Sequence, residues 1–156
     1  MTFRVGLGVD AHAFAEGVPL VLGGVRFDSP RGLAGHSDGD VITHALIDAV
    51  LGAAGLGDIG SLFPSDASTP EGISSLDLLG DAVSQVREAG YSVVNADCVL
   101  IGEEPRIAPR RGELEQILTD LVAAPVSVRA TTTDRLGFTG RGEGLAAQAV
   151  ALLTQS

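Results

Sequence analysis

The sequence is poor in aromatic side chains and in positive charge. Phe, Trp and Tyr make up 4% of its 156 residues, and Trp is absent. Its 10 Lys and Arg residues are outnumbered by 20 Asp and Glu residues, which gives a formal net charge of −10. This balance argues against nucleic acid as a partner, because proteins meet phosphate backbones with clusters of positive charge. If the protein binds phosphate groups, bound cations must supply the missing positive charge.

Cysteine and long apolar runs are also scarce. Cys98 is the single cysteine, which excludes a disulfide within the chain and favours a reducing compartment. Because Cys98 lies in an alternating apolar stretch, we expect a buried, inert thiol rather than a nucleophile. We find no run of about 20 apolar residues that would span a membrane. Residues 1–4 lead directly into strand-like sequence without the features of a signal peptide, so we expect a cytoplasmic protein with no membrane partner.

The apolar pattern predicts strands alternating with helices. The length of 156 residues favours one domain, residues 1–156, and the alternation implies a layered α/β or α+β domain. Strands are predicted at residues 3–12, 93–101 and 126–132, and as two short pieces around Gly23 and Gly24. Helices are predicted to begin with Ser37 as the N-cap, at Ser74 or Ser75, and at Pro109, and an apolar helix over Leu145–Leu153 ends the chain.

Asp10, His12 and His44 are the candidate metal ligands. Side chains alternate along a strand, so Asp10 and His12 point to the same face, about 7 Å apart. His44 lies on the following helix, four residues from both Asp40 and Asp48, and these side chains share one helix face. Three His and Asp ligands leave one open position on a tetrahedral zinc ion, as in catalytic sites. Asp40 and Asp48 either orient His44 through hydrogen bonds or form the solvated face of the helix.

The segment SDGDVITHALIDA, residues 37–49, resembles the signature of the 2-C-methyl-D-erythritol 2,4-cyclodiphosphate synthase family of the non-mevalonate isoprenoid pathway. The resemblance continues in order along the whole chain. It covers VGLGVDAH at 5–12, LGDIG at 56–60, FP at 63–64, GY at 90–91, Asn95, Asp97, Pro105, ATTT at 130–133 and LGFTGRGEG at 136–144.

The resemblance implies a specific reaction, metals and assembly. Members of the family convert 4-diphosphocytidyl-2-C-methyl-D-erythritol 2-phosphate into a cyclic diphosphate and release CMP, which makes them phosphorus–oxygen lyases. Zinc, or another divalent transition metal, is implied at Asp10, His12 and His44, and magnesium or manganese at the diphosphate. The implied fold is a two-layer α+β sandwich, a small mixed sheet with helices on one face. The sheets would face inward in a homotrimer with active sites between subunits.

Further residues match family positions one by one. Asp134 stands where the family usually has a Glu that binds the second metal, and the shorter side chain would hold the ion closer or through water. Phe138 and Arg141 match residues of an axial cavity for isoprenoid diphosphates, although a core aromatic and a turn are alternative readings of this segment. The other matched substrate positions are His36 and Ser37 for the methylerythritol phosphate, Asp58 and Gly60 for the sugar alcohol and its surroundings, Arg106 and Ala108 for the cytidyl group, and Thr131, Thr132 and Thr133 for the diphosphate.

Two other functions use the same residues. A zinc phosphohydrolase would direct an activated water at the phosphate and give a linear product. A non-catalytic trimer would bind isoprenoid diphosphates through Arg141 and Phe138, but it would have no need of the four metal-binding candidates in one chain.

Overall fold

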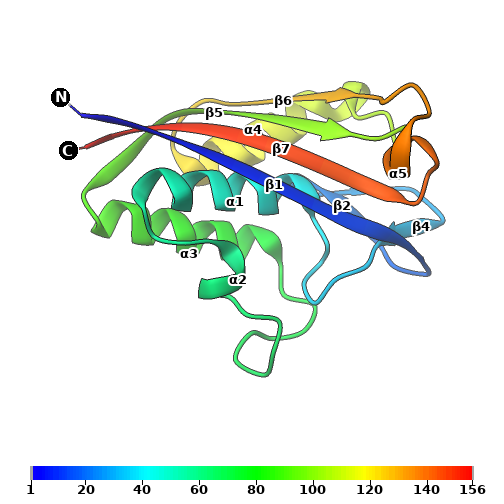
Figure 1. The fold of residues 1–156 in the computed structure, drawn as a ribbon, viewed down its shortest axis with the longest axis horizontal. Coiled ribbons are helices and arrows are strands. Elements are labelled where there is room, and N and C mark those ends of the chain that lie inside the picture. The colour runs from blue at the N-terminus through cyan, green and yellow to red at the C-terminus, as the bar shows by residue number, and fades with distance from the viewer. Residues whose placement is uncertain (1, 156) are drawn as a thin grey trace.

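The computed structural model describes residues 2–155 and contains a five-stranded mixed sheet (Figure 1). Neighbouring strands run antiparallel, except for the parallel pair β5 and β6. The strands lie in the order β4 (Arg31–Leu33), β1 (Phe3–Glu16), β7 (Gly144–Gln155), β5 (Tyr91–Ile101) and β6 (Val126–Thr131). A separate hairpin of β2 (Leu20–Leu22) and β3 (Val25–Phe27) confirms the two short extended pieces that the sequence predicted.

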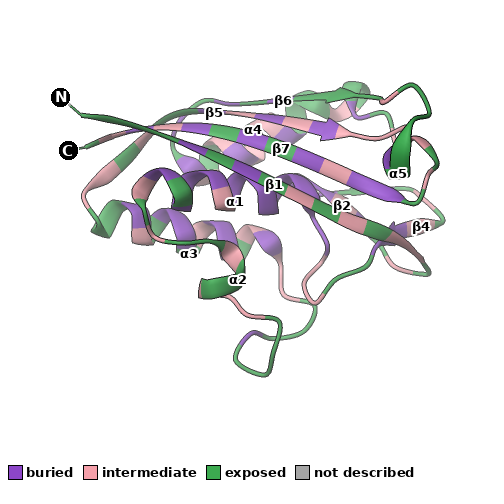
Figure 2. Cartoon of the chain, in the orientation of Figure 1, coloured by how far each residue is buried: buried purple, intermediate pink, exposed green. Residues whose placement is uncertain are grey.

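The longer helices all cover one face of this sheet (Figure 1). They are α1 (Val41–Ala54), α3 (Ser75–Glu88) and α4 (Arg111–Val122). The connections contain the short helices α2 (Ile59–Leu62) and α5 (Gly137–Gly140) and the 3-10 turn η1 (Ala108–Arg110). Figure 2 shows the buried residues concentrated where the helices meet the sheet, which confirms the α+β class with helices on one face. Among residues 2–155, no helix combines the length and the apolar character that a membrane crossing requires.

Helix α1 lies directly on β1 because two glycines allow their backbones to approach. A Cβ atom at Gly8 would lie 1.8 Å from the carbonyl oxygen of Ala45, and one at Gly6 would lie 2.0 Å from that of Ala49. Only glycine fits at such a distance. The helix is therefore held between the sheet and α3, and nearly all of its residues are buried.

The opposite face of the sheet carries an exposed apolar surface. Phe3, Val5, Leu7 and Val9 of β1 are 56%, 70%, 63% and 55% exposed. Val150, the partner of Leu7 in the β1–β7 ladder, is 45% exposed. We refer to these five residues as the β1 stripe. They alternate along the strand with the glycines that face α1, so the two faces of β1 have opposite environments.

The helix predicted over residues 145–153 was wrong, because this segment forms most of strand β7. Every second residue is buried, at Leu145, Ala147, Ala149, Ala151 and Leu153. The residues between them are mostly apolar too, so the sequence shows one continuous apolar run that a buried helix would fit equally well. Pairing with β1 on one side and β5 on the other decides for a strand.

The N-cap of α1 was also predicted wrongly. Asp40, rather than Ser37, caps this helix, and its carboxylate accepts a hydrogen bond from the backbone N–H of Thr43 at 3.1 Å. The same carboxylate accepts hydrogen bonds at 2.8 Å from the backbone N–H groups of Gly23 and Gly24 in the β2–β3 turn. Asp40 therefore joins the start of α1 to the hairpin.

Cys98 is buried in the sheet, as predicted. Burial raises the pKa of its thiol from 9.0 to about 12. The thiol therefore stays protonated at neutral pH, which excludes a role as a nucleophile under those conditions.

The contact between β1 and α1 can be tested with two Gly→Ala substitutions. Gly8→Ala forces a methyl group into the backbone of α1, and we expect it to lower the free energy of unfolding by about 2 kcal/mol or more. Gly52→Ala places the methyl group on the exposed side of α1 in open space, and it should raise stability by up to about 1 kcal/mol. Urea unfolding of both variants measures the difference, and equal stabilities would contradict the close packing.

Candidate metal centre

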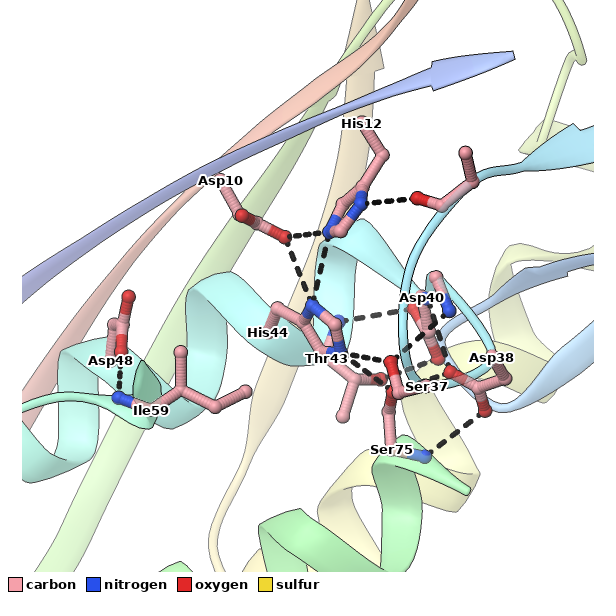
Figure 3. Close-up of polar contacts among 12 residues, drawn as sticks. Asp10, His12, Ser37, Asp38, Asp40, Thr43, His44, Asp48, Ile59 and Ser75 are labelled. Atoms are coloured by element: carbon pink, nitrogen blue, oxygen red, sulfur yellow. Dashed lines mark hydrogen bonds and ion pairs between the residues drawn. The ribbon is translucent and has the colours of Figure 1, made fainter. Parts of the chain in front are cut away.

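Asp10, His12 and His44 come together where β1 passes over α1 (Figure 3). The Oδ2 atom of Asp10 lies 2.8 Å from Nε2 of His12 and 3.0 Å from Nδ1 of His44. The two imidazole nitrogens are 3.2 Å apart. The prediction that Asp10 and His12 share one face of β1 and meet His44 is confirmed, and this is the face that the glycines turn toward α1. One carboxylate oxygen and two imidazole nitrogens therefore form a compact triangle.

This triangle fits a divalent transition metal. A tetrahedral zinc ion with bonds of about 2.0–2.1 Å to nitrogen and oxygen separates its ligand atoms by about 3.3 Å. The three distances in the structure, 2.8, 3.0 and 3.2 Å, require an expansion of only a few tenths of an ångström. Two imidazoles and one carboxylate are also ligands that zinc accepts, and they leave a fourth position open.

The far nitrogen of each imidazole is held by a hydrogen bond. Nδ1 of His12 donates to the carbonyl oxygen of Ala34 at 2.7 Å, so Nε2 points to the triangle. Nε2 of His44 lies 2.8 Å from Oγ of Ser75 and 3.0 Å from Oγ of Ser37, so Nδ1 points to the triangle. Partners of this kind fix the ring orientation in metal sites.

In the metal-free triangle, electrostatic interactions favour an ionised Asp10 beside a protonated His12. Burial raises the pKa of Asp10, but hydrogen bonds and charge interactions with His12 and His44 outweigh it and lower the pKa from 3.8 to about 2. The hydrogen bond to Asp10 raises the pKa of His12 above 6.5, against the opposing effect of burial. A metal ion must therefore displace a proton that His12 holds more tightly than a free imidazole does.

Asp40 and Asp48 do not provide the contacts that fix His44. The carboxylate of Asp40 accepts its hydrogen bonds from the β2–β3 turn and from Thr43, and complete burial raises its pKa. Asp48 accepts a hydrogen bond from the backbone N–H of Ile59 at 2.7 Å, and burial raises its pKa as well. Ser37 and Ser75 contact the far nitrogen of His44 instead. The sequence pointed to Ser75 only as a helix start, since its approach to His44 depends on how α3 packs on α1.

A cavity of about 170 Å³ opens beside the triangle. It brings the predicted residues His36, Ser37 and Gly60 next to the metal ligands. The rest of the lining is mostly apolar, with Ile59, Phe63, Ile73 and Leu78. The ring of His36 donates through Nε2 to the carbonyl oxygen of Thr69 at 2.6 Å, which joins the two loops around the cavity. A small molecule with an apolar part and a group that binds a metal ion would suit this cavity and the adjacent metal ligands.

The remaining predicted residues lie outside this lining. Asp58 caps α2, where its carboxylate accepts a hydrogen bond from Ser61 N–H at 2.8 Å. Arg106 lines a second cavity of about 410 Å³, and Ala108 begins the adjoining turn η1. Thr131, Thr132, Thr133 and Asp134 follow one another from the end of β6, and Phe138 and Arg141 lie in and just after α5.

Asp134 is not part of the Asp10–His12–His44 group. Its backbone is in the left-handed region, with φ of 53°, and Oγ1 of Thr132 donates to its carboxylate at 3.4 Å. The side chain of Arg141 is exposed and forms an ion pair with Glu143 at 2.6 Å. Within one chain, these residues form a separate group at the end of the sheet where α5 lies (Figure 1).

Comparison with known proteins assigns the chain to a family. The model of the YgbB family matches residues 3–154, and the chain belongs to this family. Among curated relatives, 2-C-methyl-D-erythritol 2,4-cyclodiphosphate synthase of Alkalilimnicola ehrlichii is 53% identical over an alignment of 156 positions, which includes 97% of this chain and 95% of the relative.

Solved structures of the same kind share the fold. The CDP-bound form of a 2C-methyl-D-erythritol-2,4-cyclodiphosphate synthase is 38% identical, with a TM-score of 0.87 over 97% of this chain and 100% of that chain. The bifunctional IspDF of Campylobacter jejuni, also 38% identical, has a TM-score of 0.95 over 99% of this chain. The chain spans 43% of that longer protein.

The pair of Asp10 and His12 predicts how stability depends on pH in metal-free protein. Folding raises the pKa of His12 above its unfolded-state value of 6.5. Protonated His12 therefore stabilises the folded state fully below pH 6.5, and this stabilisation is lost as the pH rises through the folded-state pKa. We expect the Tm, measured with a chelator, to fall across this window more in wild type than in His12→Asn. Equally steep profiles would assign the dependence to other groups.

The stabilisation that zinc provides should depend on pH in the opposite direction. Because zinc replaces the proton on His12, its affinity increases as the pH rises. The increase in Tm caused by a fixed zinc concentration should therefore be larger at pH of about 8 than at about 6. An increase that is independent of pH would contradict the assignment of His12 as a ligand.

Proposed function

We propose that this protein is a 2-C-methyl-D-erythritol 2,4-cyclodiphosphate synthase. The observation that carries the proposal is the Asp10–His12–His44 triangle beside a small cavity, in a chain 53% identical to a curated synthase over nearly its whole length. The substrate would be 4-diphosphocytidyl-2-C-methyl-D-erythritol 2-phosphate. Residues 1–156 would form one synthase domain that acts in the cytoplasm and binds neither nucleic acid nor membranes.

The proposed reaction closes a ring by displacement at phosphorus. An oxygen of the 2-phosphate forms a bond to the β-phosphorus, the bond from that phosphorus to the bridging oxygen breaks, and CMP leaves with this oxygen. The nucleophile is already anionic near neutral pH, so the chain must mainly align and neutralise two anionic groups. Holding them together removes much of the entropic barrier to ring closure.

Two divalent cations would supply positive charge at the phosphate oxygens. Asp10, His12 and His44 would hold zinc or a similar transition metal, and Asp134 would contribute to a site for magnesium or manganese at the diphosphate. His36 and Ser37 line the cavity and would hold the methylerythritol phosphate, with Gly60 beside it. Asp58 would contact the sugar alcohol, Arg106 and Ala108 the cytidyl group, and Thr131, Thr132 and Thr133 the diphosphate.

We also propose that the active protein is a homotrimer. The β1 stripe exposes several large apolar side chains in a row, which is typical of a surface covered by another protein. Burying it between copies would turn the helix-free faces of the sheets inward. The residues around Arg106 and the Thr131–Asp134 segment could then complete the metal centre of a neighbouring copy. Phe138, 44% exposed, and Arg141 would line an axial cavity that admits an isoprenoid diphosphate.

Substitution of a metal ligand tests the reaction. His44→Ala should reduce formation of cyclic diphosphate at least about 100-fold, because the metal loses one of its three protein ligands. Phosphorus NMR of the cytidyl substrate with zinc and magnesium would follow the cyclic product and CMP. Gly52→Ala, on the exposed side of the same helix, serves as the matched control and should retain activity. A linear diphosphate from the wild type would instead support a zinc phosphohydrolase.

A charge placed on the β1 stripe tests the assembly. Leu7→Glu would bury a carboxylate in the proposed subunit interface, so light scattering should show a mass near that of one chain and activity should be lost. Ser84→Glu adds the same charge to an exposed position on α3 and should leave a trimer. If Leu7→Glu keeps the mass of three chains, the stripe is not the interface.

A further inference from the structure

Behind His44 lies a chain of hydrogen bonds that ends on a carboxylate (Figure 3). Nε2 of His44 lies 2.8 Å from Oγ of Ser75, a residue with no exposed surface at the start of α3. The hydroxyl of Ser75 contacts Oδ1 of Asp38 in turn. Oδ2 of Asp38 accepts a hydrogen bond from the backbone N–H of Ser75 at 3.0 Å. Three side chains from α1, α3 and the loop before α1 are thus joined in a line.

The direction of these hydrogen bonds follows from the chemistry of the groups. An ionised carboxylate only accepts, so the hydroxyl of Ser75 must donate to Asp38. The Ser75 oxygen then presents lone pairs to His44, and Nε2 of His44 must carry the hydrogen. In the neutral ring that a metal ion binds, the lone pair is therefore on Nδ1, which lies 3.0 Å from Oδ2 of Asp10 and 3.2 Å from Nε2 of His12. This is the tautomer in which His44 can bind a metal in the triangle.

Ser37 has a different position in this arrangement. Its Oγ lies 3.0 Å from Nε2 of His44, but the residue is partly exposed and lines the cavity. The backbone N–H of Gly39, two residues further on, donates to the same oxygen at 3.2 Å. Ser37 can therefore contact a ligand in the cavity. Ser75 is buried, and both its hydroxyl and its backbone N–H donate to the carboxylate of Asp38.

We propose that Asp38 and Ser75 are positioning residues that hold His44 in its metal-binding tautomer and orientation. The proposal rests on the metal centre of the proposed function, and it assigns to these two residues a role in metal affinity. Asp38 also accepts from the backbone N–H of Asp40 at 3.1 Å, and its own N–H donates to the carbonyl oxygen of Ile73 at 3.1 Å. The carboxylate is thereby fixed before any metal binds.

Zinc affinity, measured without substrate by competition with a chromophoric chelator, tests this role. Ser75→Ala removes the acceptor for Nε2 of His44, and it should weaken zinc binding about 10-fold or more. Asp38→Asn should do the same, because an amide NH₂ facing Ser75 would donate and so reverse the chain of hydrogen bonds. Ser75→Thr keeps the hydroxyl and should restore most of the affinity. Ser74→Ala is the matched control, since the Ser74 side chain makes no capping hydrogen bond.

A second measurement separates positioning from general loss of structure. The visible absorption spectrum of the Co²⁺-loaded protein reports the ligand geometry, and it should change in Ser75→Ala and Asp38→Asn but not in Ser74→Ala. Unchanged zinc affinity and cobalt spectrum in both variants would overturn the proposal while leaving the metal centre intact. A wild type that binds no zinc would overturn the metal centre as well. Weakened zinc binding, in a protein that forms no cyclic product, would support the positioning role and sink only the proposed reaction.

Discussion

The contact of α1 with β1 is the constraint on which the rest of the structure depends. Glycine at two alternate positions of β1 brings the helix backbone into direct contact with the strand. Further along the same face of β1, Asp10 and His12 meet His44 from the helix. A longer distance between the two elements would separate the ligand atoms by more than a single ion can bridge. Main-chain packing, rather than a flexible loop, therefore sets the size of the metal centre.

Much of the site could be predicted from the sequence because it lies on regular elements. The period of two along β1 places Asp10 and His12 together, and the helical pattern around His44 is equally clear. The residues behind His44 could not be predicted in this way. Ser75 and Asp38 are 31 and 6 positions away from it in sequence, and only the packing of α3 against α1 brings the serine to the ring.

The fold, too, could be predicted where the residue pattern of an element is clear, and not where tertiary packing decides the conformation. Elements with a clear contrast between faces, such as β1 and α3, were assigned correctly. Strand β7 was mistaken for a helix because Ala and Val occupy its less buried positions and conceal the alternation. Its neighbours in the sheet, rather than its own residues, determine its conformation. The identity of the N-cap of α1 was missed for a related reason, since Asp40 is favoured there by a turn that is distant in sequence.

Both faces of strand β1 carry side chains with a specific structural role. One face carries the glycines and metal ligands under α1, and the other carries the β1 stripe. In most surface strands, the outward positions absorb random change at little cost, but here one face packs against α1 and the other is the surface that the proposed trimer would bury. During divergence, β1 should therefore accept fewer replacements than α4, whose outer face is charged and exposed. An evolutionary path to a new specificity would have to begin in the loops around the cavity and leave this strand almost unchanged.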